Sequence, residues 1–174
     1  MKKIIIVSAM FLSTSIFAFD KAAYTKIAKE TVKEALSGKV SNIDALIKKQ
    51  ETLVKLGIAG CKKYLKSHSD SRTPAAVTEK KALELVIANA DKMKKSSLEK
   101  IEENWHDGGV FKKNGVKINE IDHMGEVNSL ADTVIHAATS YLALVEYKKQ
   151  PNKDHLDQVK DELSEVLEHI KHIK

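Results

Sequence analysis

Apolar residues recur at three- and four-residue steps along most of this chain, which is the pattern of amphipathic α-helices. The longest such stripe covers roughly six helical turns and predicts one long helix. Its members are Ile43, Leu46, Ile47, Leu53, Val54, Ile58, Cys61, Tyr64 and Leu65. Gly57 lies on the same face. Because glycine has no side chain, we expect a neighbouring helix to approach closely at this position.

Capping residues and helix breakers predict the ends of five helices in all. Their N-termini are expected at Asp20, Ser41, Thr73, Ser129 and about Asp154. Asp, Ser and Thr cap helix N-termini with their side-chain oxygens, and Pro74 after Thr73 is typical of a first helical turn. The C-termini of the first, third and fourth helices follow from the breakers Gly38, Asp107–Gly109 and Pro151. The fourth helix is apolar nearly all round, so we expect it to be the most buried element.

The connection between the third and fourth predicted helices, residues 108–128, is long for a compact domain. Its apolar residues indicate that it packs against the helices; they are Val110, Phe111, Val116, Ile118 and Ile121. The patterns therefore predict an all-α fold. We expect an antiparallel four-helix bundle with an additional short N-terminal helix and a long ordered loop between the third and fourth predicted helices.

The N-terminal residues follow a different pattern. Lys2 and Lys3 precede a largely apolar run, Ile4–Leu12, which only Ser8 interrupts, and the small residue Ala18 follows after a short polar stretch and Ile16-Phe17. This pattern predicts a secretory signal peptide over residues 1–18, cleaved after Ala18 or a few residues away. The run is shorter than the roughly 20 residues of a membrane span, so no stable membrane anchor is expected after cleavage. Residues 19–174 are then expected to be a single helical-bundle domain of an exported, periplasmic protein.

Composition excludes several classes of protein. The formal net charge is +5, two units of which belong to Lys2 and Lys3, and the remaining lysines are spread along the chain. Arg72 is the single arginine, so a nucleic-acid partner is not expected. Cys61 is the single cysteine, which excludes an intramolecular disulfide and covalent c-type haem attachment, and its helical position favours a buried thiol. A homo-oligomer and an unknown small ligand both stay open.

Candidate chemistry lies between residues 103 and 136. Glu103 and His106 are three residues apart, and Glu120 and His123 repeat this spacing. Di-iron carboxylate bundles use Glu-x-x-His to supply two ligands from one helix, although the second copy here lies in the predicted loop. The pattern resembles at most half of such a site. With His136 on the apolar fourth helix, these five residues are the candidate ligands of iron, zinc or copper.

Two other interpretations stay open. The same residues are consistent with a cofactor-free polar cluster in a structural, interaction or sensor-like bundle, in which histidines stabilise a helix C-terminus and fix the loop. Alternatively, the core binds non-covalent haem b, with His136 and either Met93, Met124 or His106 as axial ligands. Cys61 has no histidine near it in sequence and no nucleophile elbow is present, so an enzyme is not favoured without a metal.

The last predicted helix carries many charged residues and three histidines, His155, His169 and His172. His169 and His172 are one turn apart and could chelate a metal weakly, with Glu165 and Glu168 nearby, but their place at an exposed C-terminus favours a solvated polar face. The acidic residues, Glu162 and Glu165 among them, are expected to form an ordinary charged surface stabilised by pairs four residues apart.

Overall fold

The structure is a computed structural model that describes residues 19–174, and within this range every regular element is helical. The long helices are α1 (Lys21–Leu36), α2 (Ile43–Ser67), α3 (Pro74–Met93), α6 (Glu126–Lys149) and α7 (Lys153–His169). The short ones are α4 (Leu98–Ile101), the π-helix η1 (Glu102–His106), α5 (Gly109–Lys113) and the 3₁₀-helices η2 (Ile118–Glu120) and η3 (Ile170–His172). The prediction of an all-α fold is confirmed. The predicted signal peptide lies outside the described residues.

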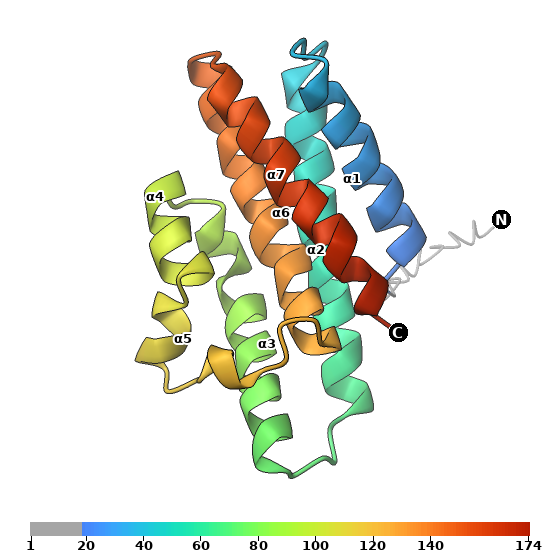
Figure 1. Cartoon of the computed structure of the whole chain (residues 1–174), viewed down its shortest axis with the longest axis vertical. Helices are drawn as coiled ribbons and strands as arrows, with labels where there is room; N and C mark the ends of the chain where they lie inside the picture. The colour runs from blue at the N-terminus through green and yellow to red at the C-terminus, as the bar shows by residue number, and fades with distance from the viewer. Residues whose placement is uncertain (1–18) are drawn as a thin grey trace, which may run out of the picture.

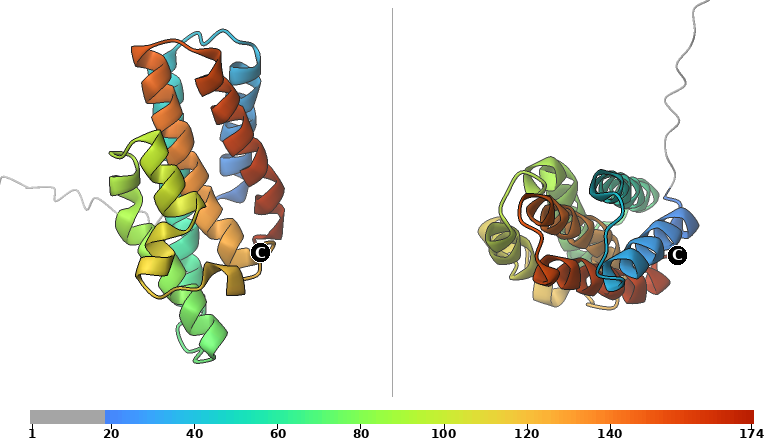
Figure 2. Two further views of the ribbon diagram at one scale, coloured as in Figure 1. Left: turned by 60° about the vertical axis from the view of Figure 1, so that its left-hand side comes forward. Right: turned by 90° about the horizontal axis from the view of Figure 1, so that it is seen from above.

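Four of the long helices are neighbours in a ring, since α1 contacts α2, α2 contacts α6, α6 contacts α7 and α7 contacts α1. The fifth, α3, packs on the outside against α2 and α6 (Figures 1 and 2). The contacts thus leave α3, and not the short N-terminal helix that was expected from the sequence, outside this ring. A length of 16 residues still allows α1 to lie along α7 and α2 and to bury Tyr24, Ala28, Thr31 and Ala35.

The helix α6 is the most buried element, as its apolar composition predicted. All residues from Ser129 to Ser140 are buried. Gly57 of α2 lies directly against it, because a Cβ added there would be 2.6 Å from Oγ1 of Thr133. Tyr24 of α1 donates its hydroxyl proton to the carbonyl oxygen of Thr133 at 2.7 Å. These contacts fix α6 relative to α1 and α2.

Several helix ends differ from the sequence prediction. The third predicted helix is two helices, since α3 ends at Met93 and Ser97 caps α4 by accepting a hydrogen bond from the amide of Lys100. Serine competes for backbone hydrogen bonds, so adjacent serines favour such a break. The observed cap of α2 is Asn42 instead of Ser41, and α6 begins three residues before the expected Ser129, after Gly125. Asp20 and Thr73 cap α1 and α3 as predicted.

The connection from α3 to α6 folds back along the side of α6 that is remote from α1 (Figure 1). Phe111, Val116 and Ile121 are buried in the core, as their apolar character predicted. The ring of Trp105 meets the ring of Phe111 edge-on, with centroids 5.5 Å apart. The connection therefore forms one wall of the space beside α6.

None of the helices in the described part of the chain has the length and apolarity of a membrane span.

Candidate metal centre

A pocket of about 320 Å³ opens between this connection and the helices α6 and α7. Its apolar walls are Trp105, Phe111, Ile118, Ile121 and Ile135. Its polar lining consists of His106, His123, Asn128, Asp132, His136 and Glu165. Imidazoles and carboxylates thus gather in a pocket whose lining is about half polar and half apolar.

His106 reaches this pocket from the last position of the π-helix η1. π-helical turns are rare and occur frequently at functional sites, because they change the direction of a side chain within a helix. Nε2 of His106 lies 2.9 Å from Oγ1 of Thr139, whose hydroxyl bonds to the carbonyl oxygen of Ile135 at 3.1 Å. Because that hydroxyl has only one proton to donate, His106 is the donor to Thr139 in this arrangement.

His136, His106 and Glu162 form the first group of the site. His136 is 5 % exposed, and its Nδ1 donates to Oε2 of Glu162 at 2.7 Å. The same oxygen lies 3.6 Å from Nε2 of His106. The two imidazole rings meet edge-on with centroids 4.8 Å apart. One ligand atom from each residue lies within 4.8 Å of the other two, so this group could hold a metal ion.

A second group lies next to the first and consists of Asp132, His169 and His123. Nδ1 of His169 donates to Oδ2 of Asp132 at 2.5 Å, and both side chains are buried. The rings of His169 and His123 meet edge-on with centroids 5.0 Å apart. Asn128 connects the group to the loop, because its amide donates to Oδ2 of Asp132 at 3.3 Å and to the carbonyl oxygen of His123 at 3.2 Å.

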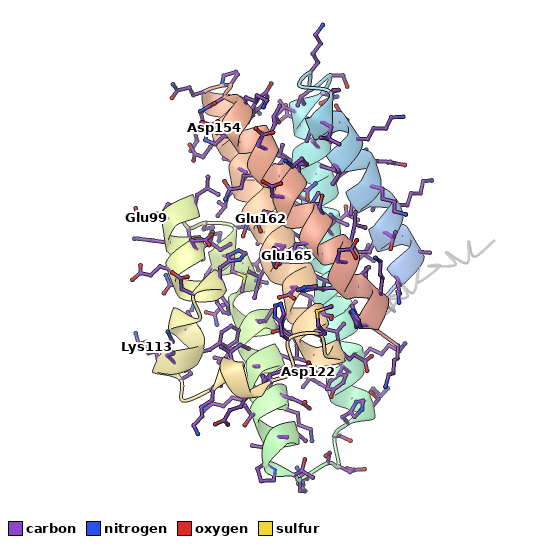
Figure 3. The ribbon with its side chains drawn as sticks, in the orientation of Figure 1. Glu99, Lys113, Asp122, Asp154, Glu162 and Glu165 are labelled. Carbon is purple, nitrogen blue, oxygen red and sulfur yellow. The ribbon has the colours of Figure 1, made fainter. Side chains whose placement is uncertain are left out.

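The acidic side chains that α7 contributes to the site, Glu162 and Glu165, come from the middle part of that helix. Glu162 and Glu165 lie where α7 crosses α6, whereas Asp154 lies at the far end of α7 (Figure 3). The side chain of Glu162 is 11 % exposed, and Glu165 lines the pocket. The expectation that Glu162 and His169 belong to a solvated face is wrong. Crossing of α6 and α7 covers them, and sequence spacing alone does not show where two helices cross.

The carboxylates raise the pKa of both buried histidines. Burial by itself lowers the pKa of His136, but the hydrogen bond to Glu162 and the charges of Asp132, Glu162 and Glu165 outweigh it. The hydrogen bond to Asp132 is the main cause that raises the pKa of His169 above 6.5; burial and His136 oppose it, and Glu165 adds to it. The protonated forms of both histidines therefore favour the folded state.

We predict that the metal-free protein becomes less stable as the pH rises. The two raised pKa values contribute stability that is fully present below the ordinary pKa of 6.5 and is lost as the pH rises through the folded-state values. Denaturant unfolding with a chelator present, between about pH 6 and pH 9, measures this decline. A His136→Gln/His169→Gln variant should have a much flatter profile. An equally steep decline in that variant would assign the effect to other groups.

The structure brings together some of the five sequence-predicted residues and separates others. His106 and His136 lie side by side, and His123 lines the same pocket next to His169. Glu103 is exposed, because residues three apart are further apart around a π-helix than around an α-helix. Glu120 is also exposed and pairs with Lys117 at 2.7 Å. The two predicted glutamates therefore do not lie in the cluster.

Sequence reasoning did not select Asp132 and Glu162, and it considered His169 and Glu165 only as part of a weak, exposed chelating group. A signal was present, since Asp132 and His136 are four residues apart on α6, and Glu162, Glu165 and His169 are spaced by three and four on α7. Each set lies on one helical face. The same spacing is common among ordinary surface charges, so only the packing of α6 on α7 distinguishes them.

Other candidate groups lie away from this pocket. Cys61 is fully buried, as predicted, and burial raises the pKa of its thiol to about 12, which makes it unreactive at neutral pH. Of the two methionines considered as haem ligands, Met93 is buried in the hydrophobic core and Met124 is 45 % exposed. Neither methionine lines the pocket of the histidines.

Comparisons with protein-family models, with curated proteins and with solved structures gave no match to this chain. The geometry described above therefore carries the functional argument.

Proposed function

We propose that this chain is a metal-binding protein in which His106, His136 and Glu162 hold a divalent transition-metal ion. The observation that carries the proposal is the convergence of their ligand atoms to within 4.8 Å of one another. Ligand atoms bonded to one ion at 2.0–2.2 Å are about 3 to 3.5 Å apart. The separations of 2.7 Å and 3.6 Å between Glu162 and the two imidazoles are close to this geometry, and no separation within the group exceeds 4.8 Å.

The donor set indicates which ions suit the site. Two imidazoles and one carboxylate are the ligands of many zinc sites and of non-haem iron(II) sites. Copper(II) also accepts imidazole and oxygen ligands, so it belongs to the same test. Three protein ligands leave coordination positions for water or a small molecule, and the pocket beside His106 and His136 provides the space for one.

The surroundings proposed for this site follow from the rest of the chain. The pattern of residues 1–18 supports export to the periplasm, and residues 19–174 are proposed to be one helical domain. The ring of contacts among α1, α2, α6 and α7 supports an antiparallel four-helix bundle, with α3, α4 and α5 packed on one side of it.

A cofactor-free polar cluster is the second candidate. It is favoured by the hydrogen bonds that the histidines already make within the protein, from His106 to Thr139 and from His136 to Glu162. In that case the groups stabilise the contact between α6, α7 and η1, and a metal ion has no effect on stability.

Metal titration separates these two candidates. The purified protein is stripped of metal with a chelator and then titrated by calorimetry with Zn²⁺, Fe²⁺ or Cu²⁺. We expect saturable binding of at least one of these ions, and at a free concentration of 100 times Kd a gain in folding free energy of about 2.7 kcal/mol. Mg²⁺ serves as the control, because it prefers oxygen ligands. No saturable binding of any of the three transition metals would contradict the proposal.

A further inference from the structure

The second group of the cluster repeats the construction of the first. Each group has a buried histidine on one long helix, a carboxylate on the opposite long helix, and a second histidine from the connection that precedes α6. In each, Nδ1 of the buried histidine bonds to the carboxylate of the other helix, at 2.7 Å and 2.5 Å. The groups are His136, Glu162 and His106 in the first, and His169, Asp132 and His123 in the second.

The ring geometry is also repeated. The paired rings meet edge-on in both groups, with centroids 4.8 Å and 5.0 Å apart. A histidine nitrogen about 2.1 Å from an ion has its ring centre about 3.2 Å away, so rings in adjacent coordination positions have centres about 4.5 to 5.2 Å apart. Both pairs fall within this range. Among the described residues, only the first group has all its ligand atoms within 4.8 Å of one another, so the exposed His123 has to turn toward Asp132 and His169 for the second group to bind an ion.

We infer that His123, Asp132 and His169 hold a second divalent transition-metal ion, so that the cluster is a two-metal centre. The inference extends the proposed function and rests on it. The second group again offers two imidazoles and a carboxylate, so it would bind the same class of ion as the first.

Asp132 belongs to the second group but also lies near the first. Its Oδ2 accepts from His169, and its Oδ1 lies 3.9 Å from Nε2 of His136. This buried carboxylate therefore faces a histidine of each group. Glu165 is at the rim of the same pocket. Asp132, Glu162 and Glu165 supply three negative charges, which favour the binding of cations in this pocket.

The test counts ions per chain. The full-length product is loaded with excess Zn²⁺, desalted and analysed for zinc by mass spectrometry. We expect about two ions per chain in the unchanged protein, about one in His123→Ala, about one in His106→Ala, and none in the double variant. His123 is exposed, so its replacement leaves the fold intact, which circular dichroism checks. The exposed His68 lies in neither group, and His68→Ala should keep both ions.

The contrary results are distinguishable. One ion that His123→Ala retains and His106→Ala loses would overturn the second site and leave the proposed function standing. One ion that both variants lose would show a single ion shared by the two groups, and this would also overturn the inference. If the unchanged protein binds no zinc, iron or copper, the proposed function fails together with the second site.

Discussion

Replacing His136 by alanine is expected to weaken metal binding at the first group by more than about 100-fold, because even the loss of an outer hydrogen-bond partner of a ligand weakens binding 10- to 100-fold. His136 is the most central ligand, since its ring faces His106 on one side and its two nitrogens face Glu162 and Asp132. Calorimetric titration of the chelator-stripped variant with Zn²⁺ measures the change.

A surface histidine gives the matched control for this loss. His68→Ala removes one exposed imidazole that stacks on Tyr64, and it should leave the zinc affinity within about twofold of the unchanged protein. His136→Gln is a second variant that keeps a polar side chain of similar length, and it separates loss of a ligand from loss of packing. If His136→Ala folds and binds zinc with unchanged affinity, His136 is not a ligand.

Replacing Gly57 by alanine is expected to lower the free energy of unfolding by about 2 kcal/mol. The new Cβ would be 2.6 Å from Oγ1 of Thr133, 2.8 Å from Cγ2 of Val134 and 3.0 Å from the carbonyl carbon of Thr133. Backbone atoms of α6 cannot move aside as a flexible side chain does, so α2 and α6 must separate. This outweighs the roughly 1 kcal/mol by which alanine favours a helix over glycine. Thermal unfolding should show a midpoint lower by about 4 to 8 °C.

Gly60 provides the matched control on the same helix. A Cβ at Gly60 would meet only side-chain atoms, at 2.8 Å from Cδ2 of Leu130 and 3.0 Å from the ring of Phe19. These groups can rotate, so Gly60→Ala should change the free energy of unfolding by less than about 1 kcal/mol. Equal losses in both variants would show that the approach of α2 to α6 at Gly57 is not the tight contact described here.

The regular helices could be predicted from the sequence because their signals are local. Asp20 and Thr73 cap the helices that they were expected to cap, and the apolar composition of α6 predicted its burial. Gly57 also predicted a close contact. The break after Met93 was missed, since the apolar stripe continues through Leu98 and Ile101 as if one helix ran on. The π-helix that follows has no local signature in residue type.

The site was only half predictable, for a physical reason. His136 stood out because it lies on a helix that is apolar nearly all round, and His106 and His123 because each follows a glutamate by three residues. Glu162 and His169 did not, because α7 carries many other charges, and burial of these two depends on where α7 crosses α6. Glu103 and Glu120 had the expected spacing but not the expected geometry. Spacing within one element predicts a shared face, whereas a ligand set is a relation among elements that are distant in sequence.

The crossed pairing of α6 with α7 has a mechanical consequence. Histidine and carboxylate alternate between the two helices, with His136 held by Glu162 and Asp132 holding His169. Two separate attachment points along α6 and α7 resist both sliding and a change in the crossing angle of the two helices, whereas with one point the helices could still pivot about it. An ion bound at one group would therefore hold the other group in its binding geometry. We expect the two proposed ions to bind cooperatively for this reason.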